Sequence, residues 1–288
     1  MSRNEFTTFA VAGVGGLGQY IAAELVAQGA TVFALTRGGG NTKIPAGVTE
    51  RVVDYADSQS VQDALGGVDV LVSALSGSGL RVQPALADAA KKAGVKLFVP
   101  SEYGVRTPEI TWGFMLAKPK LQQRLKEIGL PYTLFFNGSF SDLGPRFGLD
   151  LPNKKATLVG SGTAPVSWTT RPDIGHFIAY ILTHLPPSTL DGGIFGVEGS
   201  RHTLLEMLAL VETTKLSGGK LDITHRDESE VKRAVEEKDI RALDLATIGD
   251  YLSILTDEGL CCVGEYDATH LVPDFKPLNL AQAIEKYW

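Results

Sequence analysis

Three glycines near the N-terminus have the spacing of a nucleotide-binding turn. The apolar run Phe9–Ala12 is followed by Gly13-x-Gly15-x-x-Gly18, and then by small and apolar residues at helical spacing. Gly13 would permit a tight turn, Gly15 would let the backbone approach a pyrophosphate, and Gly18 would let the helix pack closely on the strand. Phosphate would then bind the unpaired N–H groups at the start of the helix. The order strand, glycine turn, helix predicts a dinucleotide site, although the spacing alone is a weak signal in a chain with 32 glycines.

A basic residue stands where the adenosine end of such a nucleotide would lie. Residues Thr31–Leu35 form a second expected strand, and Thr36 and Arg37 follow it. A carboxylate at this point binds the ribose hydroxyls of NAD, whereas an arginine can pair with a 2′-phosphate. The sequence therefore favours NADP(H). The alternative is that Arg37 is a solvated loop residue.

Polar and small residues also follow the other expected strands. Asp54 ends a strand that begins near Val48, Ser73 and Ser76 follow the strand Val68–Val72, and Ser101 follows the strand Val95–Val99. The carboxyl ends of parallel strands meet at one edge of a sheet, and ligands bind there. We therefore expect Asp54, Ser73, Ser76 and Ser101 to lie in the nucleotide crevice. Each also has a purely structural interpretation, as a helix cap or as part of a tight turn.

Strands and helices alternate through the first half of the chain. This alternation predicts an α/β fold with a Rossmann-type, doubly wound parallel sheet. We expect an NAD(P)-binding domain over residues 1–140 and a smaller α/β substrate-binding portion over residues 141–288. This division leaves room for a strand or a helix of the second portion to return to the first.

Composition excludes several other classes of protein. The chain has 27 basic and 33 acidic residues, so it lacks the positive surplus of a nucleic-acid binder. The chain has no apolar run of about 18 residues, so we expect no membrane span. The first residues also lack the apolar core of a signal peptide. The only cysteines are the neighbours Cys261 and Cys262, and the five histidines have no ligand-like spacing. We expect a cytoplasmic protein without a metal site, which binds a small molecule.

Several motifs together resemble the isoflavone reductase-like and NmrA-like family of atypical short-chain dehydrogenases. The matching segments are Gly13-Val-Gly15-Gly16-Leu17-Gly18, Thr36-Arg37, Val99-Pro-Ser101-Glu-Tyr103-Gly, Lys118-Pro-Lys120, Gly129-Leu-Pro-Tyr-Thr133 and the stretch from Val166 to Phe177. The resemblance implies a Rossmann protein, monomeric or homodimeric, with a C-terminal substrate domain. It also implies that the glycine segment, Gly16 and Leu17 included, binds NADPH.

The resemblance further implies a catalytic role for Lys118. In the reductase branch of the family, a lysine at this position acts as acid and base on phenolic substrates. Phe114 stands four residues earlier, where many short-chain dehydrogenases have a tyrosine, so this chain has no phenol there to donate a proton. Pro119 disfavours helix at the residue before it, so we expect Lys118 at the start of a helix. Ser101 and Tyr103 are alternative proton donors. The alternative to a catalytic role is that Lys118 is an ordinary solvated lysine on the surface.

The leading hypothesis is therefore an NADPH-dependent reductase of a small aromatic or enone-like metabolite, with Lys118 as acid/base. One alternative is a non-catalytic NADP(H)-sensing regulator like those of the NmrA-like branch, and another is a redox-neutral isomerase or cyclase on the same scaffold. A flat substrate would suit a pocket lined by aromatic rings, which core packing could equally use. The candidates are Trp112, Phe114, Phe136, Phe140 and Phe147.

Overall fold

The central element of the molecule is a parallel sheet. The computed structural model describes residues 5–39, 43–238 and 244–288. Five parallel strands have the order β3-β2-β1-β4-β5. Their bounds are β1 Thr8–Ala12, β2 Thr31–Thr36, β3 Val48–Val52, β4 Val70–Ser73 and β5 Leu97–Val99. A parallel bridge between Phe98 and Tyr132 leads on to β6 (Leu134–Phe136), and β6 pairs in parallel with β11 (Ile194–Gly196).

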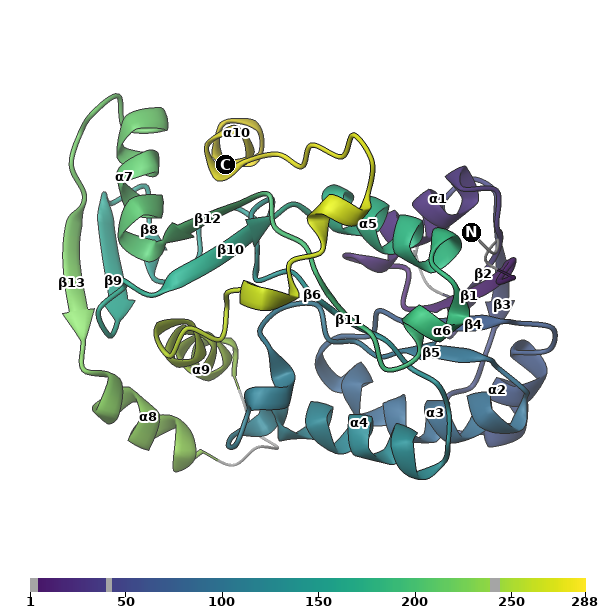
Figure 1. Ribbon diagram of the computed structural model, residues 1–288. Coiled ribbons are helices and arrows are strands. Elements are labelled where there is room, and N and C mark those ends of the chain that lie inside the picture. Colours follow the sequence, from purple (N-terminus) through teal and green to yellow (C-terminus); the bar gives the residue numbers. More distant parts are fainter. Residues whose placement is uncertain (1–4, 40–42, 239–243) are drawn as a thin grey trace.

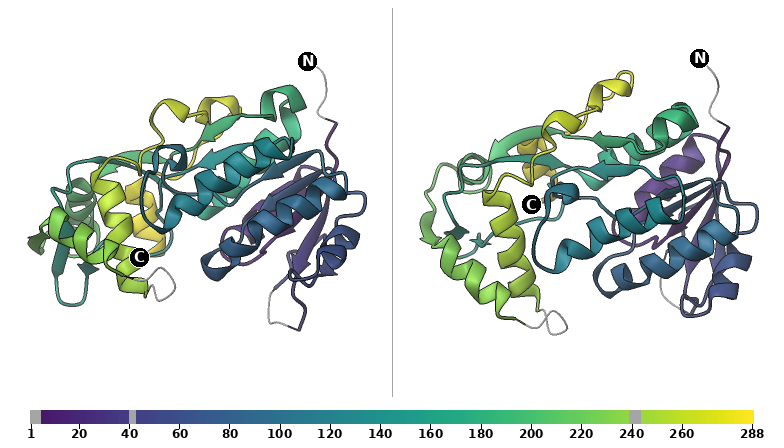
Figure 2. Two further views of the ribbon diagram at one scale, coloured as in Figure 1. Left: turned by 90° about the horizontal axis from the view of Figure 1, so that it is seen from below. Right: turned by 60° about the horizontal axis from the view of Figure 1, so that its bottom comes forward.

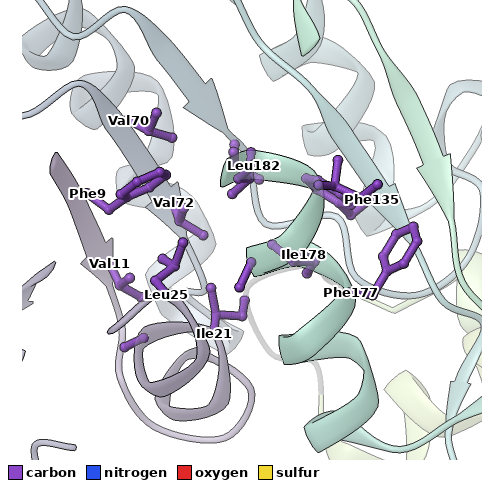
Figure 3. Close-up of a cluster of buried hydrophobic side chains, with 14 of the residues drawn as sticks. Phe9, Val11, Ile21, Leu25, Val70, Val72, Phe135, Phe177, Ile178 and Leu182 are labelled. Atoms are coloured by element: carbon purple, nitrogen blue, oxygen red, sulfur yellow. The ribbon is translucent and has the colours of Figure 1, made fainter. Parts of the chain in front are cut away.

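Helices cover both faces of this sheet, as a doubly wound fold requires (Figure 1). One face carries α1 (Gly18–Ala27) and α5 (Arg171–His184), and the other carries α2 (Ser58–Ala64), α3 (Gln83–Lys92) and α4 (Ala117–Glu127). Figure 3 shows the core between the sheet and the first pair of helices, including Phe9, Ile21 and Ile178. The predicted α/β Rossmann-type fold is confirmed.

Helix α5 lies far along the chain from α1, yet the two helices are in close contact. A Cβ built on Gly175 would lie 2.8 Å from the backbone carbon of Tyr20, so only glycine permits this approach. Thr170 caps α5, because its side chain accepts a hydrogen bond from the backbone N–H of Asp173. The second half of the chain thus contributes α5 and β11 to the layers around the sheet. The division of the chain at residue 140 remains a prediction.

The rest of the second half forms two small sheets and further helices beside the large sheet (Figures 1 and 2). One small sheet has the order β12-β10-β7 and the other the order β13-β9-β8. The bounds are β7 Ser139–Phe140, β8 Leu149–Asp150, β9 Lys155–Val159, β10 Pro165–Thr169, β12 Ser200–Thr203, β13 Asp222–Arg226, α6 Pro187–Leu190, α7 Leu204–Thr214, α8 Glu228–Glu236, α9 Leu245–Asp257 and α10 Leu280–Tyr287.

A second hydrophobic core holds this part together. Its largest fully buried side chains are Trp168 and Tyr251, and Met207 lies among them. Short 3-10 turns connect several elements, over Gly77–Val82, Thr107–Glu109, Phe114–Leu116, Gly264–Tyr266 and Thr269–Leu271. None of the helices within the described ranges is long and apolar enough to cross a membrane.

Candidate functional site

The glycine turn between β1 and α1 is as tight as its sequence predicts. Gly13 has a φ of +90°, and a Cβ built there would lie 3.0 Å from the carbonyl oxygen of Ala74. A Cβ on Gly18 would collide with the carbonyl oxygen of Gly13 and lie 2.9 Å from the Cβ of Ala74. A Cβ on Gly15 would meet no atom within 4 Å, so open space lies over that residue. The turn therefore exposes backbone at Gly15 and Gly16, while Leu17 and Gly18 are buried.

The predicted contacts of the adenosine end lie beyond β2 and β3. Arg37 is exposed directly after β2, and Asp54 is exposed after β3, where its Oδ1 accepts a hydrogen bond of 2.9 Å from the N–H of Ala56. The Tyr55 hydroxyl donates to the carbonyl oxygen of Leu35 at 3.1 Å. Burial raises the pKa of Tyr55 to about 12, and the nearby charge of Arg37 opposes that shift. Arg37 thus lies near the ends of both strands.

Three predicted serines follow the next strands, in different settings. Ser73 ends β4 and is fully buried, whereas Ser76 is exposed just before a short turn. Ser101 follows β5, and its hydroxyl donates to the carbonyl oxygen of Leu75 at 2.7 Å. Its N–H donates to Oε1 of Gln83 at 2.9 Å. Ser101 therefore ties two loops of the crevice together, which is a structural task.

Buried polar atoms without hydrogen-bond partners lie at or beyond the carboxyl ends of four successive strands. Four such side-chain atoms in the described part of the chain stand at or after the ends of β4, β5, β6 and β7. They are Ser73 Oγ in the last residue of β4, Tyr103 Oη after β5, Asn137 Oδ1 after β6 and Ser141 Oγ after β7. A buried polar atom without a hydrogen bond costs about 1–3 kcal/mol, so such atoms usually meet a ligand or water. These atoms therefore offer hydrogen-bonding groups to a polar ligand such as a dinucleotide.

Lys118 lies in the first turn of α4, as expected from Pro119, and it is only 7% exposed. Its Nζ donates to the backbone carbonyl oxygen of Glu102 at 2.6 Å and lies 3.9 Å from the Glu102 carboxylate. That carboxylate is buried too. It accepts hydrogen bonds from Thr107 Oγ1 at 2.6 Å and from Gln122 Nε2 at 3.0 Å. Lys118 is thus not a surface lysine.

The surroundings of Lys118 act on its pKa in opposite directions. Burial lowers the pKa of Lys118, because a charged ammonium loses its hydration. The Glu102 carboxylate raises it, because a negative charge stabilises the protonated form. Burial is the larger effect, so the pKa of Lys118 lies below its ordinary value. A lysine with a lowered pKa is suited to acid/base chemistry.

A cavity of about 570 Å³ lies partly beyond the carboxyl ends of β5 and β6. Its wall includes Tyr103, Gly104 and Val105 from the loop after β5, and it continues on loops, strands and helices from residue 138 onward. Lys118 is not among the described residues that line it, but Met115 of the preceding turn is. The other lining residues are Gly138, Ser139, Phe140, Arg146, Phe147, Gly148, Thr157, Val159, Arg226, Ala246, Gly249, Asp250, Leu252, Ser253, Thr256 and Cys261.

The aromatic residues that the sequence suggested for this pocket divide into two groups. Phe140 and Phe147 line the cavity. Trp112 and Phe114 instead contact Tyr251, with ring centroids 4.7 and 4.6 Å apart. Phe136 is fully buried and contacts Tyr266. The pocket hypothesis was therefore wrong for these three rings, because packing in the hydrophobic core occupies them.

Arg171 is a functional candidate that sequence reasoning did not single out. It opens α5, and its Nη1 would lie 3.7 Å from a Cβ built on Gly16 in the glycine turn. Its Nε donates to Asp142 Oδ2 at 2.8 Å, which fixes the side chain. The position at the helix start was visible in the sequence. The approach to Gly16 was not, because it depends on the packing of α5 against α1.

The fold and the glycine turn define a protein of the Rossmann class. Comparison with family models matches residues 7–248 to the NmrA-like family. The chain belongs to this family, and the resemblance seen in its motifs is confirmed.

Two relatives illustrate the range of similarity. The chain is 32% identical to oxidoreductase aprR of Aspergillus flavus over 244 positions, which cover 79% of this chain and 80% of the relative. It is 29% identical to pinoresinol reductase 1 of Arabidopsis thaliana over 310 aligned positions, which cover 95% of each chain.

Solved structures show the same fold. A structure of "AtPrR2 with NADP+ and (+)pinoresinol" matches 99% of this chain and 100% of its own, with a TM-score of 0.81 and 24% identity. Leucoanthocyanidin reductase of Vitis vinifera in complex with NADPH matches 97% and 98% of the two chains, with a TM-score of 0.81 and 19% identity.

Proposed function

We propose that this chain is an NADPH-dependent reductase of a small aromatic or enone-like metabolite. One observation carries the proposal. The glycine turn, the unsatisfied polar atoms of Ser73 and Tyr103 and the cavity-lining residues Tyr103–Val105 all lie at or beyond the carboxyl ends of β1, β4 and β5. A nucleotide bound along these strand ends would present its reactive end to a substrate in the cavity. The reductases among the relatives support this assignment.

The residues of the chain have separate tasks in this reaction. When bound, NADPH supplies the hydride that adds to the substrate. The glycine turn holds the pyrophosphate, Arg37 pairs with the 2′-phosphate, and Arg171 covers the turn at Gly16. Asp54, Ser73, Ser76 and Ser101 complete the crevice. The rings of Phe140 and Phe147 hold a flat substrate.

A proton must also reach the substrate, because hydride addition leaves it negatively charged. Lys118 is the first candidate, since burial lowers the pKa of its ammonium group and eases proton release. Tyr103 is the second, because its hydroxyl lies buried and without a hydrogen bond to any described residue, and its ring lines the cavity. Burial and the charge of Glu102 raise the pKa of Tyr103, so this phenol stays protonated. The same residue could therefore act as a donor but not as a base.

The decisive experiment uses NADPH deuterated at C4 on one face or on the other. Each labelled cofactor is mixed with the protein and with phenolic, enone and quinone-like compounds, and mass spectrometry measures deuterium in the products. We expect label from only one face, because a fixed nicotinamide presents one side to the cavity. Tight NADPH binding without any product would contradict the proposal and favour a nucleotide sensor. An unlabelled isomer of the substrate would favour a redox-neutral reaction.

A further inference from the structure

Among the described residues of the cavity wall, Arg146 carries a positive charge that takes part in no ion pair. Its described lining residues include three charged side chains, which are Arg146, Arg226 and Asp250. Arg226 and Asp250 form a two-pronged ion pair with N–O distances of 2.6 and 3.0 Å. Burial raises the pKa of the Cys261 thiol to about 12, so this group is neutral. Only the charge of Arg146 is left over.

Among the described residues, the carboxylate whose charge acts on Arg146 is that of Asp142, and it already binds Arg171. Asp142 accepts a hydrogen bond of 3.1 Å from the backbone N–H of Arg171 through Oδ1, and one of 2.8 Å from Arg171 Nε through Oδ2. The guanidinium of Arg146 forms no hydrogen bond or ion pair with any residue that the structure describes. Partial burial and the charge of Arg171 lower the pKa of Arg146, while Asp142 raises it. Arg146 thus lies beside the Arg171–Asp142 ion pair, which is neutral as a whole. A bound anion would stabilise the charge of Arg146.

The loop that carries Arg146 is held in a fixed conformation. Phe147 has a φ of +53°, which is uncommon for a residue with a side chain, and Gly148 has a φ of +72°. A Cβ on Gly148 would collide with the carbonyl oxygen of Thr157. The backbone N–H of Thr157 in turn donates a hydrogen bond of 3.0 Å to the carbonyl oxygen of Gly148. The Phe147 ring packs edge-on against Trp168. Such a strained and well-anchored loop commonly presents a functional side chain.

The two arginines of this cluster face different parts of the molecule. Arg171 stands over the glycine turn at Gly16 and so serves the nucleotide side. Arg146 lines the cavity together with the rings of Phe140 and Phe147. Arg146 is exposed as a residue, so a ligand can reach it from solvent.

We propose that the cavity takes an aromatic or enone-like substrate with a carboxylate group, and that Arg146 binds this carboxylate. The inference rests on the proposed function for the reaction itself, but the charge recognition does not require turnover. An arginine binds a carboxylate through two parallel hydrogen bonds, which adds direction to the attraction. The carboxylate then fixes which end of the substrate points toward the crevice, and neutral compounds of equal shape bind less tightly.

The test compares 4-hydroxycinnamate with its methyl ester as probes of the full-length protein loaded with NADP+. Calorimetry measures both dissociation constants and that of NADP+ for the wild type, Arg146→Gln, Arg146→Lys and Arg233→Gln. Arg233 lies on α8 outside the cavity, so its variant controls for the loss of one positive charge. Hydrogen bonds to charged groups contribute about 1.5–3 kcal/mol, so we expect the wild type to prefer the acid by about 10- to 100-fold.

The preference should vanish in Arg146→Gln, survive in part in Arg146→Lys and stay unchanged in Arg233→Gln. Equal binding of acid and ester by the wild type, binding of neither probe, or an acid preference that survives Arg146→Gln would overturn the proposal. A loss of NADP+ affinity in Arg146→Gln without loss of the acid preference would assign Arg146 to a cofactor phosphate instead. This binding test does not measure turnover. If the acid preference is found but the deuterated NADPH experiment shows no hydride transfer, only the reductase assignment is contradicted.

Discussion

The nucleotide crevice and the cavity beside it are built in different ways. The crevice is shaped by backbone and small residues at the ends of neighbouring strands, such as Gly13, Gly18 and Ser73. The cavity is shaped by residues of loops, strands and helices that are spread between Tyr103 and Cys261. A change in the crevice should therefore alter fold and nucleotide binding together. A change in the cavity wall should alter the substrate and leave the nucleotide in place.

The largest expected effect is at Lys118, which is buried beside the Glu102 carboxylate. Replacing it with methionine keeps the volume but removes the proton, and we expect turnover to fall by about 10²- to 10⁴-fold with unchanged NADPH affinity. A proton donor must be protonated, so wild-type activity should fall as the pH rises through the pKa of Lys118. Because burial lowers that pKa, this limb of the pH–rate profile lies below 10.5.

The control for Lys118 is arginine, which keeps the positive charge but does not release its proton. We expect Lys118→Arg to be as inactive as Lys118→Met in steady-state kinetics. Turnover retained in both variants, together with its loss in Tyr103→Phe, would transfer the proton donation to Tyr103.

The next effect compares two crowded glycines, one in each region. Gly18→Ala and Gly148→Ala both force a Cβ against a backbone carbonyl oxygen, from Gly13 and from Thr157 respectively. Overpacking of this kind destabilises a protein by about 1–3 kcal/mol, which thermal unfolding would measure. Gly18→Ala should also lose NADPH binding, whereas Gly148→Ala should bind NADPH normally and lose affinity for substrate. Equal loss of NADPH affinity in both variants would show that the two regions are not independent.

The smallest effect is expected at the rim of the crevice, at Arg37. A 2′-phosphate can gain two charge-assisted hydrogen bonds from an arginine. Arg37→Ala should therefore weaken NADPH binding by about 10- to 100-fold and leave NADH binding almost unchanged, as fluorescence titration would show. Arg51→Ala is a poor control because Arg51 binds two carbonyl oxygens of the α2 region. The exposed Arg233 is a better one. An equal loss of both nucleotides would remove Arg37 from phosphate recognition.

The sequence was sufficient to predict the sheet and the glycine turn, because each depends on residues close together in the chain. Alternating apolar strands and helices locate β1 to β6, and a left-handed φ at Gly13 is a local requirement. The Rossmann-type fold and the family were therefore predicted correctly. The roles of the crevice residues and of Lys118 stay predictions that the experiments above can test.

The sequence was not sufficient for the cavity, because its walls depend on contacts between distant segments. Nothing in the order of residues shows that Lys118 meets the carbonyl oxygen of Glu102, or that Arg171 reaches Gly16. The unpaired state of Arg146 is equally hidden, since it depends on Asp142 binding Arg171 instead. Aromatic residues were also ambiguous, because rings such as Trp112 and Phe114 suit a hydrophobic core as well as a pocket.

The position of α5 and β11 late in the chain has a consequence for folding during synthesis. On the ribosome, a nascent chain that ends after Phe136 would have β6 without its neighbour β11 and α1 without α5. An unpaired strand edge and an uncovered apolar helix face favour aggregation and chaperone binding. Both are covered only after Gly196 has emerged and the chain has turned back on itself. The segment that must be synthesised before this layer can close is therefore much longer than the segment that carries the nucleotide motif.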